Sequence, residues 1–464
     1  MIEIQAKLLR GPVYFVNETL QCLITLRNIS NRSTNINDLL TDESSTNSIQ
    51  KNGSNQSSDL VERICWANVQ IHCFCNVDES QIDPDEIIEE EGPMKLNRFN
   101  SMNRGRSNNS NNLFKQKRNS LTNEIYSKND TSFHESLIRG EKGLIIYSSK
   151  PKILFCDLQL ESDQSQTFVY NETLPLNLNP SYSSNRVKYC YKLTIGAQRI
   201  GSAIYFLKIP IRILTIDGFS LQSIPCIPNG SNDLDEDTDI NESSSSLSSF
   251  MFDDESKDSS TILDMALHRI ESMVSKRIPH TFNITNSSGK VAKFIIFKTV
   301  YRLGEEVIGL FDFSESVVKC IRYSVTLQSE EEITDRFLLK QNNSRKSIAK
   351  IQQNNHCHYQ EYCLDLSHSP MNITIPYTVT PSFSNSLVTL RWNLHFSFII
   401  HNDPTRTVRS LRMEHETEDG KLSLCQRQLD VQIMTWDLPI KIVATYPAHI
   451  AKGFQMASIG TLNI

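Results

Sequence analysis

The feature that most constrains the fold is a turn-and-strand pattern that occurs twice in the chain. One copy is Pro12–Leu26, PVYFVNETLQCLITL, and the other is Thr299–Phe313, TVYRLGEEVIGLFDF. In both copies the residues after the turn alternate with period two, which indicates a half-buried β-strand. Solenoid repeats recur every ~20–50 residues, so two copies this far apart indicate two similar domains instead.

The turn inside each copy is expected to specify the fold. A shift of 287 positions (14 to 301) aligns the two turns. Gly304 supplies the left-handed backbone that a tight turn needs, and Asn17 belongs to the non-glycine type that tolerates this region best. We interpret the matched positions as turn-stabilising and not as a site. They are Tyr14, Asn17, Glu18, Tyr301, Gly304 and Glu305.

Two further landmarks recur in the same order. A long alternating strand is expected at Val187–Ile195, VKYCYKLTI, and again at Leu387–Ile399, LVTLRWNLHFSFI. Each half then closes with a similar run, LKIPIRIL and WDLPIKIV, in which Pro210 and Pro439 take the same place. Proline cannot donate to a strand ladder, so these runs are expected at a sheet edge or bulge. The landmarks together predict an all-β chain with two β-sandwiches in tandem.

Polar insertions interrupt this pattern. The chain has 464 residues, of which 39% are apolar, and this fits folded domains diluted by polar segments. We predict a first sandwich over 1–217, with disordered inserts at about 31–62 and 81–140. An acidic and serine-rich linker follows over 218–279. A second sandwich spans 280–446, with a polar loop at about 334–367, and a tail spans 447–464.

The linker contains one predicted helix, at residues 261–277. Its apolar residues recur at i, i+3 and i+4 spacing, which is typical of an amphipathic helix. Two interpretations stay open, because this stripe could dock on a partner or pack across the two domains. The candidate contact residues are Leu263, Leu267, Ile270 and Val274.

The chain carries no common catalytic motif. It lacks a phosphate-binding G-x-x-x-x-G-K-[ST], a G-x-S-x-G, an H-E-x-x-H and a C-x-x-C, which argues against a GTPase or ATPase. His356–His358 with Cys363 resembles a zinc group, but the spacing matches no standard site. Asp235–Asp239 resembles the start of a calcium loop that lacks the required Gly and Glu. We therefore expect no catalytic residue, no metal and no cofactor.

Charge and hydropathy restrict the possible partners. The net charge of −6 predicts no general attraction to nucleic acid. The basic stretch Lys95–Arg118 is interpreted as a solvated loop rather than as a contact for anionic lipid or an acidic partner. No apolar run has the length of a signal peptide core or a membrane span, so we expect a cytosolic protein, free or peripherally bound to a membrane.

The repeated turn and the order of the segments resemble known families. The turn YRLGEEVIG resembles the Y-x-x-G-E-x-V-x-G turn that opens arrestin-like sandwiches. A narrower resemblance, to the Rgp family, rests on segments in both halves: MIEIQAKLLRGPVYFVNETLQCLITLRN, WANVQIHC, SKPKILFCDLQL, VKYCYKLTIGAQRI, KIPIRIL, FKTVYRLGEEVIG, LRWNLHFSF and WDLPIKI.

This resemblance implies a function in membrane traffic. Members of the Rgp family are the smaller partner of a two-subunit guanine-nucleotide exchange factor. The larger partner is the Ric protein, and the target is the Golgi Rab GTPase of the Rab-six (yeast Ypt-six) kind. The resemblance implies a peripheral Golgi protein in endosome-to-Golgi and intra-Golgi transport, and it transfers no catalytic residue. The alternative is an arrestin-like cargo adaptor that binds the tails of membrane proteins, with extended peptides adding to a sheet.

Overall fold

The first sandwich consists of two facing sheets. The computed structural model describes residues 1–29, 61–91, 143–215, 259–339, 349–364, 366–401, 412–417, 420–425 and 430–464. The small sheet has the order β23-β1-β3-β7, with strands Ile459–Asn463, Ile2–Leu8, Thr19–Asn28 and Ser165–Thr173. The large sheet has the order β2-β10-β9-β4-β5, with strands Val13–Phe15, Ile204–Leu214, Val187–Arg199, Glu62–Val77 and Leu144–Ser148. In addition, β6 (Lys152–Leu160) pairs with β4, and β8 (Tyr182–Ser183) pairs with β9.

The second sandwich repeats this arrangement. Its small sheet has the order β11-β12-β14-β17, with strands His280–Asn286, Gly289–Ile296, Glu306–Asp312 and His368–Thr374. Its large sheet has the order β13-β22-β19-β15-β16, with strands Val300–Arg302, Val431–Val443, Val388–His401, Cys320–Ile333 and Ile351–Tyr362. β18 (Phe383–Ser384) pairs with β19, and β20 (Arg412–Thr417) pairs with β21 (Gly420–Cys425) to form a separate hairpin.

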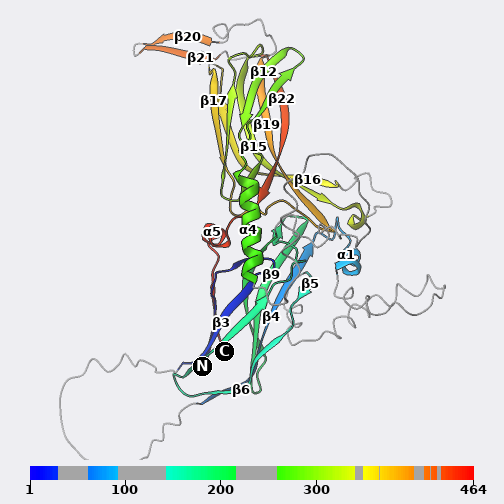
Figure 1. Ribbon diagram of the computed structural model, residues 1–464, viewed down its shortest axis with the longest axis vertical. Helices are drawn as coiled ribbons and strands as arrows, with labels where there is room; N and C mark the ends of the chain where they lie inside the picture. The colour runs from blue at the N-terminus through cyan, green and yellow to red at the C-terminus, as the bar shows by residue number, and fades with distance from the viewer. Residues whose placement is uncertain are drawn as a thin grey trace, which may run out of the picture.

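The predicted fold class, two all-β sandwiches in tandem, is confirmed. The sandwiches follow one another along the long axis of the molecule (Figure 1). In each, the short strand before the repeated turn pairs in parallel with the closing strand: Tyr14 lies opposite Ile213, and Tyr301 lies opposite Ile442.

Alternating side chains fill the space between the sheets. In the second sandwich, Phe294 of the small sheet meets Phe396 of the large sheet with ring centroids 5.0 Å apart. In the first, Ile209 of β10 faces the backbone of Gly460 in β23. Burying each such aliphatic or aromatic side chain contributes roughly 1.5–3 kcal/mol.

Both prolines lie where, in the described ranges, the closing strand has a strand neighbour on one side only, although the short strands β2 and β13 are the outermost strands of the two sheets. Pro210 lies opposite Lys192 of β9, and Pro439 lies opposite Asn393 of β19. On the other side, β10 pairs with β2 only over Arg212–Leu214, so no strand of the described chain borders Pro210 there. A missing N–H therefore costs no ladder hydrogen bond.

The prediction of a polar loop over 334–367 is wrong for most of its described part. Residues Ile351–Tyr362 form β16, which pairs with β15 and forms an edge of the large sheet. Its sequence lacks an apolar face because only a few of its side chains, such as Tyr359 and Cys357, reach the core. The His356–His358 run therefore lies within a strand, where neighbouring side chains point to opposite faces.

Parts of the other predicted inserts also have structure. Helix α1 (Pro84–Glu91) follows Ile82, and the side chains of Ile82 and Ile87 are buried, so the insert predicted over 81–140 begins with an ordered helix. Residues 92–140 of that insert, with the basic stretch Lys95–Arg118, lie outside the described residues. So does the insert at 31–62, apart from its last two residues, and so does most of the linker with Asp235–Asp239.

The linker helix and the tail both lie at the junction of the sandwiches. Helix α4 spans Ser259–Ser275, close to the predicted 261–277, and it crosses from one sandwich to the other (Figure 1). The predicted tail forms helix α5 (Pro447–Phe454) and strand β23. β23 pairs with β1 and takes the place that β11 takes in the second sandwich. We therefore propose that the first domain comprises β23 in addition to residues 1–217.

Candidate functional site at the junction of the two sandwiches

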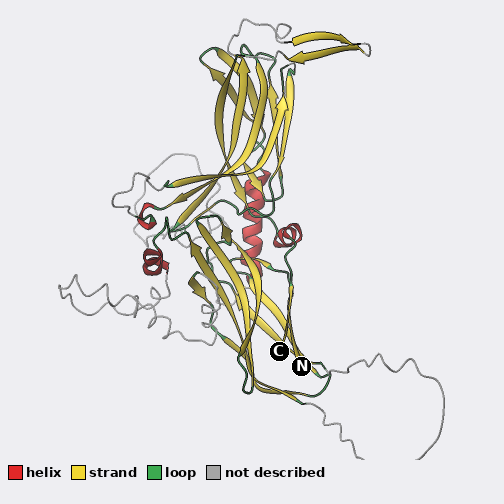
Figure 2. Cartoon of the chain, turned by 180° about the vertical axis from the view of Figure 1, so that it is seen from behind, coloured by secondary structure: helices red, strands yellow, loops and turns green. Residues whose placement is uncertain are grey.

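Buried polar side chains cluster where the two sandwiches meet. Seen from behind, the lower end of the second sandwich abuts the upper end of the first, and the helices of the described residues gather around this junction (Figure 2). The contacts across it decide whether the two sandwiches form one surface or two independent ones.

Arg212 is the main anchor of the first sandwich in the second. It lies in β10, within the closing run IRIL, and is only 6% exposed. Its guanidinium donates to the carbonyl oxygens of Tyr377 at 2.8 Å and Val379 at 2.7 Å. It also lies 5.2 Å from the ring centroid of Phe454 in α5. Burial lowers the pKa of Arg212 to about 10, so the side chain stays protonated at neutral pH.

Tyr377 packs between two glycines of different elements. A Cβ atom on Gly304 would lie 2.1 Å from the Tyr377 ring, and a Cβ on Gly453 would lie 2.5 Å from it. Gly304 also has a φ of +79°, which favours glycine. The turn of the second sandwich therefore serves two purposes. It reverses the chain, and it leaves room for the ring of Tyr377, the residue whose backbone carbonyl accepts a hydrogen bond from Arg212.

A second anchor is a buried ion pair between Arg186 and Glu331. The Arg186 Nε atom lies 3.6 Å from Glu331 Oε1, and the two side chains are 1% and 0% exposed. Tyr182 donates its hydroxyl to the other carboxylate oxygen of Glu331. Arg186 also donates to the carbonyl oxygen of Lys350 at 3.2 Å. Burial and the Glu331 carboxylate raise the pKa of Tyr182 well above its usual range, so its hydroxyl remains a donor.

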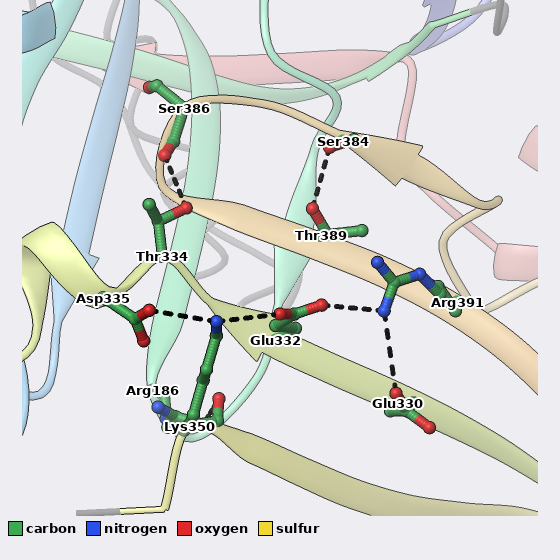
Figure 3. A network of polar contacts seen from close by, with 10 residues as sticks. All are labelled: Arg186, Glu330, Glu332, Thr334, Asp335, Lys350, Ser384, Ser386, Thr389 and Arg391. Atoms are coloured by element: carbon green, nitrogen blue, oxygen red, sulfur yellow. Dashed lines mark hydrogen bonds and ion pairs between the residues drawn. The ribbon is translucent and has the colours of Figure 1, made fainter.

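An exposed ion-pair network borders this buried pair (Figure 3). Lys350 lies 3.2 Å from Glu332 and 3.1 Å from Asp335. Arg391 lies 2.7 Å from Glu332 and 3.8 Å from Glu330. Lys350 and Arg391 lower the pKa of Glu332, which is consequently ionised at neutral pH. Exposed pairs contribute only about 0–1 kcal/mol each, so this network orients the strand ends more than it stabilises the fold.

Neutral hydrogen bonds complete the junction. Asn385 donates its amide to Asn179 at 3.0 Å and to the Tyr189 hydroxyl at 3.2 Å. Thr380 donates to the carbonyl oxygen of Ser181 at 3.2 Å. Each bond joins the second sandwich to the first, so the junction is polar and paired over much of its width.

A backbone clasp joins the sandwiches at another point. Ile82, just before α1, forms an isolated antiparallel bridge with Leu338, and the Asp83 amide donates to the Phe337 carbonyl at 2.9 Å. The first residues of a stretch predicted as disordered thus form part of the junction.

The predicted turn residues occupy matching positions in the two turns. The Phe15 amide donates to Glu18 Oε2 at 2.9 Å, and the Arg302 amide donates to Glu305 Oε2 at the same distance. Each glutamate carboxylate thereby stabilises its turn by accepting a hydrogen bond from the backbone amide three residues before it. The φ angle of Asn17 is +63°, similar to the +79° of Gly304.

The two tyrosines that precede the turns lie in the cores. Tyr14 and Tyr301 are 0% and 1% exposed, and the Tyr301 hydroxyl donates to the Lys298 carbonyl at 2.7 Å. The structure assembles each set of three within its own sandwich. These contacts support the interpretation of all six as fold-specifying residues, which stays a proposal.

The candidate contact helix packs within the chain. Ile270 and Val274 are buried, and Leu267 is half-buried, while the side chain of Leu263 lies outside the described part. Ile270 lines a small cavity with Thr215 of the first sandwich and Ile442 of the second. The interpretation that the stripe packs across the two domains is supported for these residues, and a partner contact stays a prediction.

The junction is suited to holding two surfaces in a fixed relation. The part of the chain that the structure describes contains no group of three His, Cys, Asp or Glu side chains able to hold a metal ion. In the same ranges, no helix has the length and apolar character to cross a membrane. The shifted pKa values of Arg212 and Tyr182 follow mainly from burial of groups that anchor one sandwich in the other.

The anchors could not be predicted, because the sequence around a single charged residue does not show which distant residue it pairs with. The only signal for Arg212 is its place within an apolar run. Glu331 is the middle of three consecutive glutamates, and nothing in the sequence separates it from its exposed neighbours.

Comparison with known proteins gives a consistent relationship. The family model Rgp1 matches residues 63–220 and 226–401. The human protein named RAB6A-GEF complex partner protein 2 is 31% identical over 468 residues, with 100% of both chains covered. The bovine protein of that name is also 31% identical, over 451 residues that cover 96% of this chain and 95% of the relative. Among solved structures, the sporulation control protein Spo0M of Bacillus subtilis matches 46% of this chain and 49% of its own, at 10% identity and a TM-score of 0.22, which is too low to carry an argument.

Proposed function

The chain belongs to the Rgp1 family, and we propose that it is a subunit of a two-subunit guanine-nucleotide exchange factor for a GTPase of the Rab6 type. The observation that carries the proposal is the match to the human and bovine proteins named RAB6A-GEF complex partner protein 2, which covers both sandwiches and the segments that join them. We place its action at the Golgi membrane, as a peripheral protein in endosome-to-Golgi and intra-Golgi transport.

Nucleotide exchange requires no covalent chemistry from this subunit. An exchange factor binds the nucleotide-free GTPase more tightly than the loaded form, and so shifts the population toward release. Such a shift depends on complementary surfaces and not on a nucleophile or a general base. The chain is therefore proposed as a non-hydrolytic, regulatory subunit.

We propose that this subunit scaffolds and stabilises the larger one. The support comes from the junction, where Arg212 and the Arg186–Glu331 pair hold the two sandwiches together. A partner that contacts both sandwiches would then meet one preformed surface, and binding to it would not require ordering of the two domains.

Co-purification and exchange kinetics test the proposal together. A tagged chain is expected to capture the larger subunit, and the pair is expected to release labelled GDP from the GTPase faster than the larger subunit alone. Loss of partner abundance with an unchanged rate per molecule would reduce this chain to a passive stabiliser. Recovery of membrane-protein tails without the larger subunit would favour the adaptor.

A further inference from the structure

Helix α5 and the turn after β1 form one exposed surface with an unusual composition. We call it the α5 patch, and it consists of Lys7, Leu9, Arg10, Lys452, Phe454 and Ile459. All six residues are exposed, including the apolar Leu9 at 46%, Phe454 at 42% and Ile459 at 47%.

Backbone pairing brings these residues together. Lys7 and Ile459 are direct neighbours across β1 and β23, and the Leu8 amide donates to the Ser458 carbonyl at 2.8 Å. On the other side of the turn, a Cβ atom on Gly11 would lie 4.0 Å from the Ala451 side chain in α5. The turn at Leu9 and Arg10 therefore adjoins the helix that carries Lys452 and Phe454.

The charges of the α5 patch have one sign. Residues 438–464 contain no Asp or Glu, although the whole chain has a net charge of −6. On the turn side, the carboxylate of Glu18 is buried and lies 3.5 Å from Arg10. Glu3, further along β1, lies opposite Arg27 of β3. Lys7 and Lys452 make no ion pair with a described residue.

Exposed apolar side chains among cations fit one kind of partner in particular. A bilayer with anionic lipids offers negative headgroups to Lys and Arg, and an apolar layer beneath them for Leu, Phe and Ile. An exposed apolar patch rimmed by polar residues often marks an interaction surface.

We propose that the α5 patch contacts the surface of an anionic lipid bilayer. The inference rests on the proposed function for its location, because a Golgi GTPase is activated at a membrane. It assigns the membrane-facing side to the end of the small sheet of the first sandwich that lies at the junction.

Vesicle sedimentation with matched variants tests this proposal. The full chain, alone and with its larger partner, is mixed with vesicles of phosphatidylcholine or of phosphatidylcholine with phosphatidylserine. Wild type should bind the second kind, and less at high salt. K7Q/K452Q should bind about 25-fold less, since each cation near such a surface contributes about five-fold. L9S/I459S should lose about ten-fold or more, because two apolar side chains no longer enter the bilayer. Arg10 is left intact because its removal would strand Glu18.

The control is K150Q, which removes an exposed lysine outside the α5 patch and should leave binding unchanged. Wild type that ignores anionic vesicles, or K7Q/K452Q that binds like wild type, would overturn the proposal. So would variants that lose the larger subunit while they keep vesicle binding, which would make the patch a protein interface. GDP release measured in solution without vesicles stays a separate readout, so failure of the proposed function and failure of the membrane contact give different results.

Discussion

The Arg186–Glu331 pair gives the sharpest prediction about how the sandwiches are held together. Glu331→Gln keeps the shape of the side chain and a partner for the Tyr182 hydroxyl, but removes the charge that compensates Arg186. Both side chains are 1% exposed or less, so water cannot replace the lost carboxylate. The buried guanidinium then loses the carboxylate that is paired with it across the junction.

The expected loss in the free energy of unfolding is about 3–5 kcal/mol, the range for breaking a buried pair from one side. Replacing both partners by apolar residues, as in R186M/E331L, should cost much less, about 1–2 kcal/mol or nothing, because no charge remains buried. In thermal unfolding the single variant should melt roughly 6–20 °C lower, at about 2–4 °C per kcal/mol.

Tryptophan fluorescence during urea unfolding measures these differences. Trp66 reports on the first sandwich, and Trp392 and Trp436 report on the second. The matched control is Glu332→Gln, one residue further along β15, in the exposed network of Figure 3, which should cost less than about 1 kcal/mol. The reasoning is refuted if E331Q and E332Q lose the same stability, or if the double variant is as unstable as E331Q.

Two further predictions use the repeated turns. Gly304→Ala should lower the free energy of unfolding by about 1–2 kcal/mol through left-handed strain and by about 1–3 kcal/mol more through displacement of the Tyr377 ring, whereas Asn17→Ala should lose only the contribution from strain. Urea unfolding of G304A, N17A and G304A/Y377A separates the two contributions, and equal losses in G304A and N17A would contradict the packing role of Gly304. Burial raises the pKa of Glu18, so the folded state holds the Glu18 proton more tightly than the unfolded state, and the contribution of Glu18 to stability falls as the pH rises above 4.5. The difference in unfolding free energy between wild type and E18Q should show this slope, and a difference that does not change with pH would refute the prediction.

The architecture can be predicted from the sequence because the same pattern of turn, alternating strand and closing strand occurs twice in it. Period-two alternation, a turn with Asn17 or Gly304, and a closing strand with Pro210 or Pro439 each have a local physical cause, and the structure places all of them as local reasoning predicts. The stripe of α4 is equally local, since the helical period alone defines it.

What the sequence does not reveal depends on contacts between distant residues. Strand β16 is polar on both faces, because it lies at a sheet edge and its pairing with β15 comes from the backbone. β23 is too short to show a period, and its place beside β1 is set by how the chain returns across the junction. The pairing of Arg186 with Glu331, far along the chain, is likewise visible only once both sandwiches are in place.

The proposed role as an exchange-factor subunit is tested by the rate at which labelled GDP leaves a Rab6-type GTPase in solution. The larger subunit is measured alone, with this chain, and with the E331Q chain at equal concentrations of assembled complex. We expect a higher rate per complex with the wild-type chain and a lower one with E331Q. Full activity of the larger subunit in the absence of this chain would contradict the proposed role.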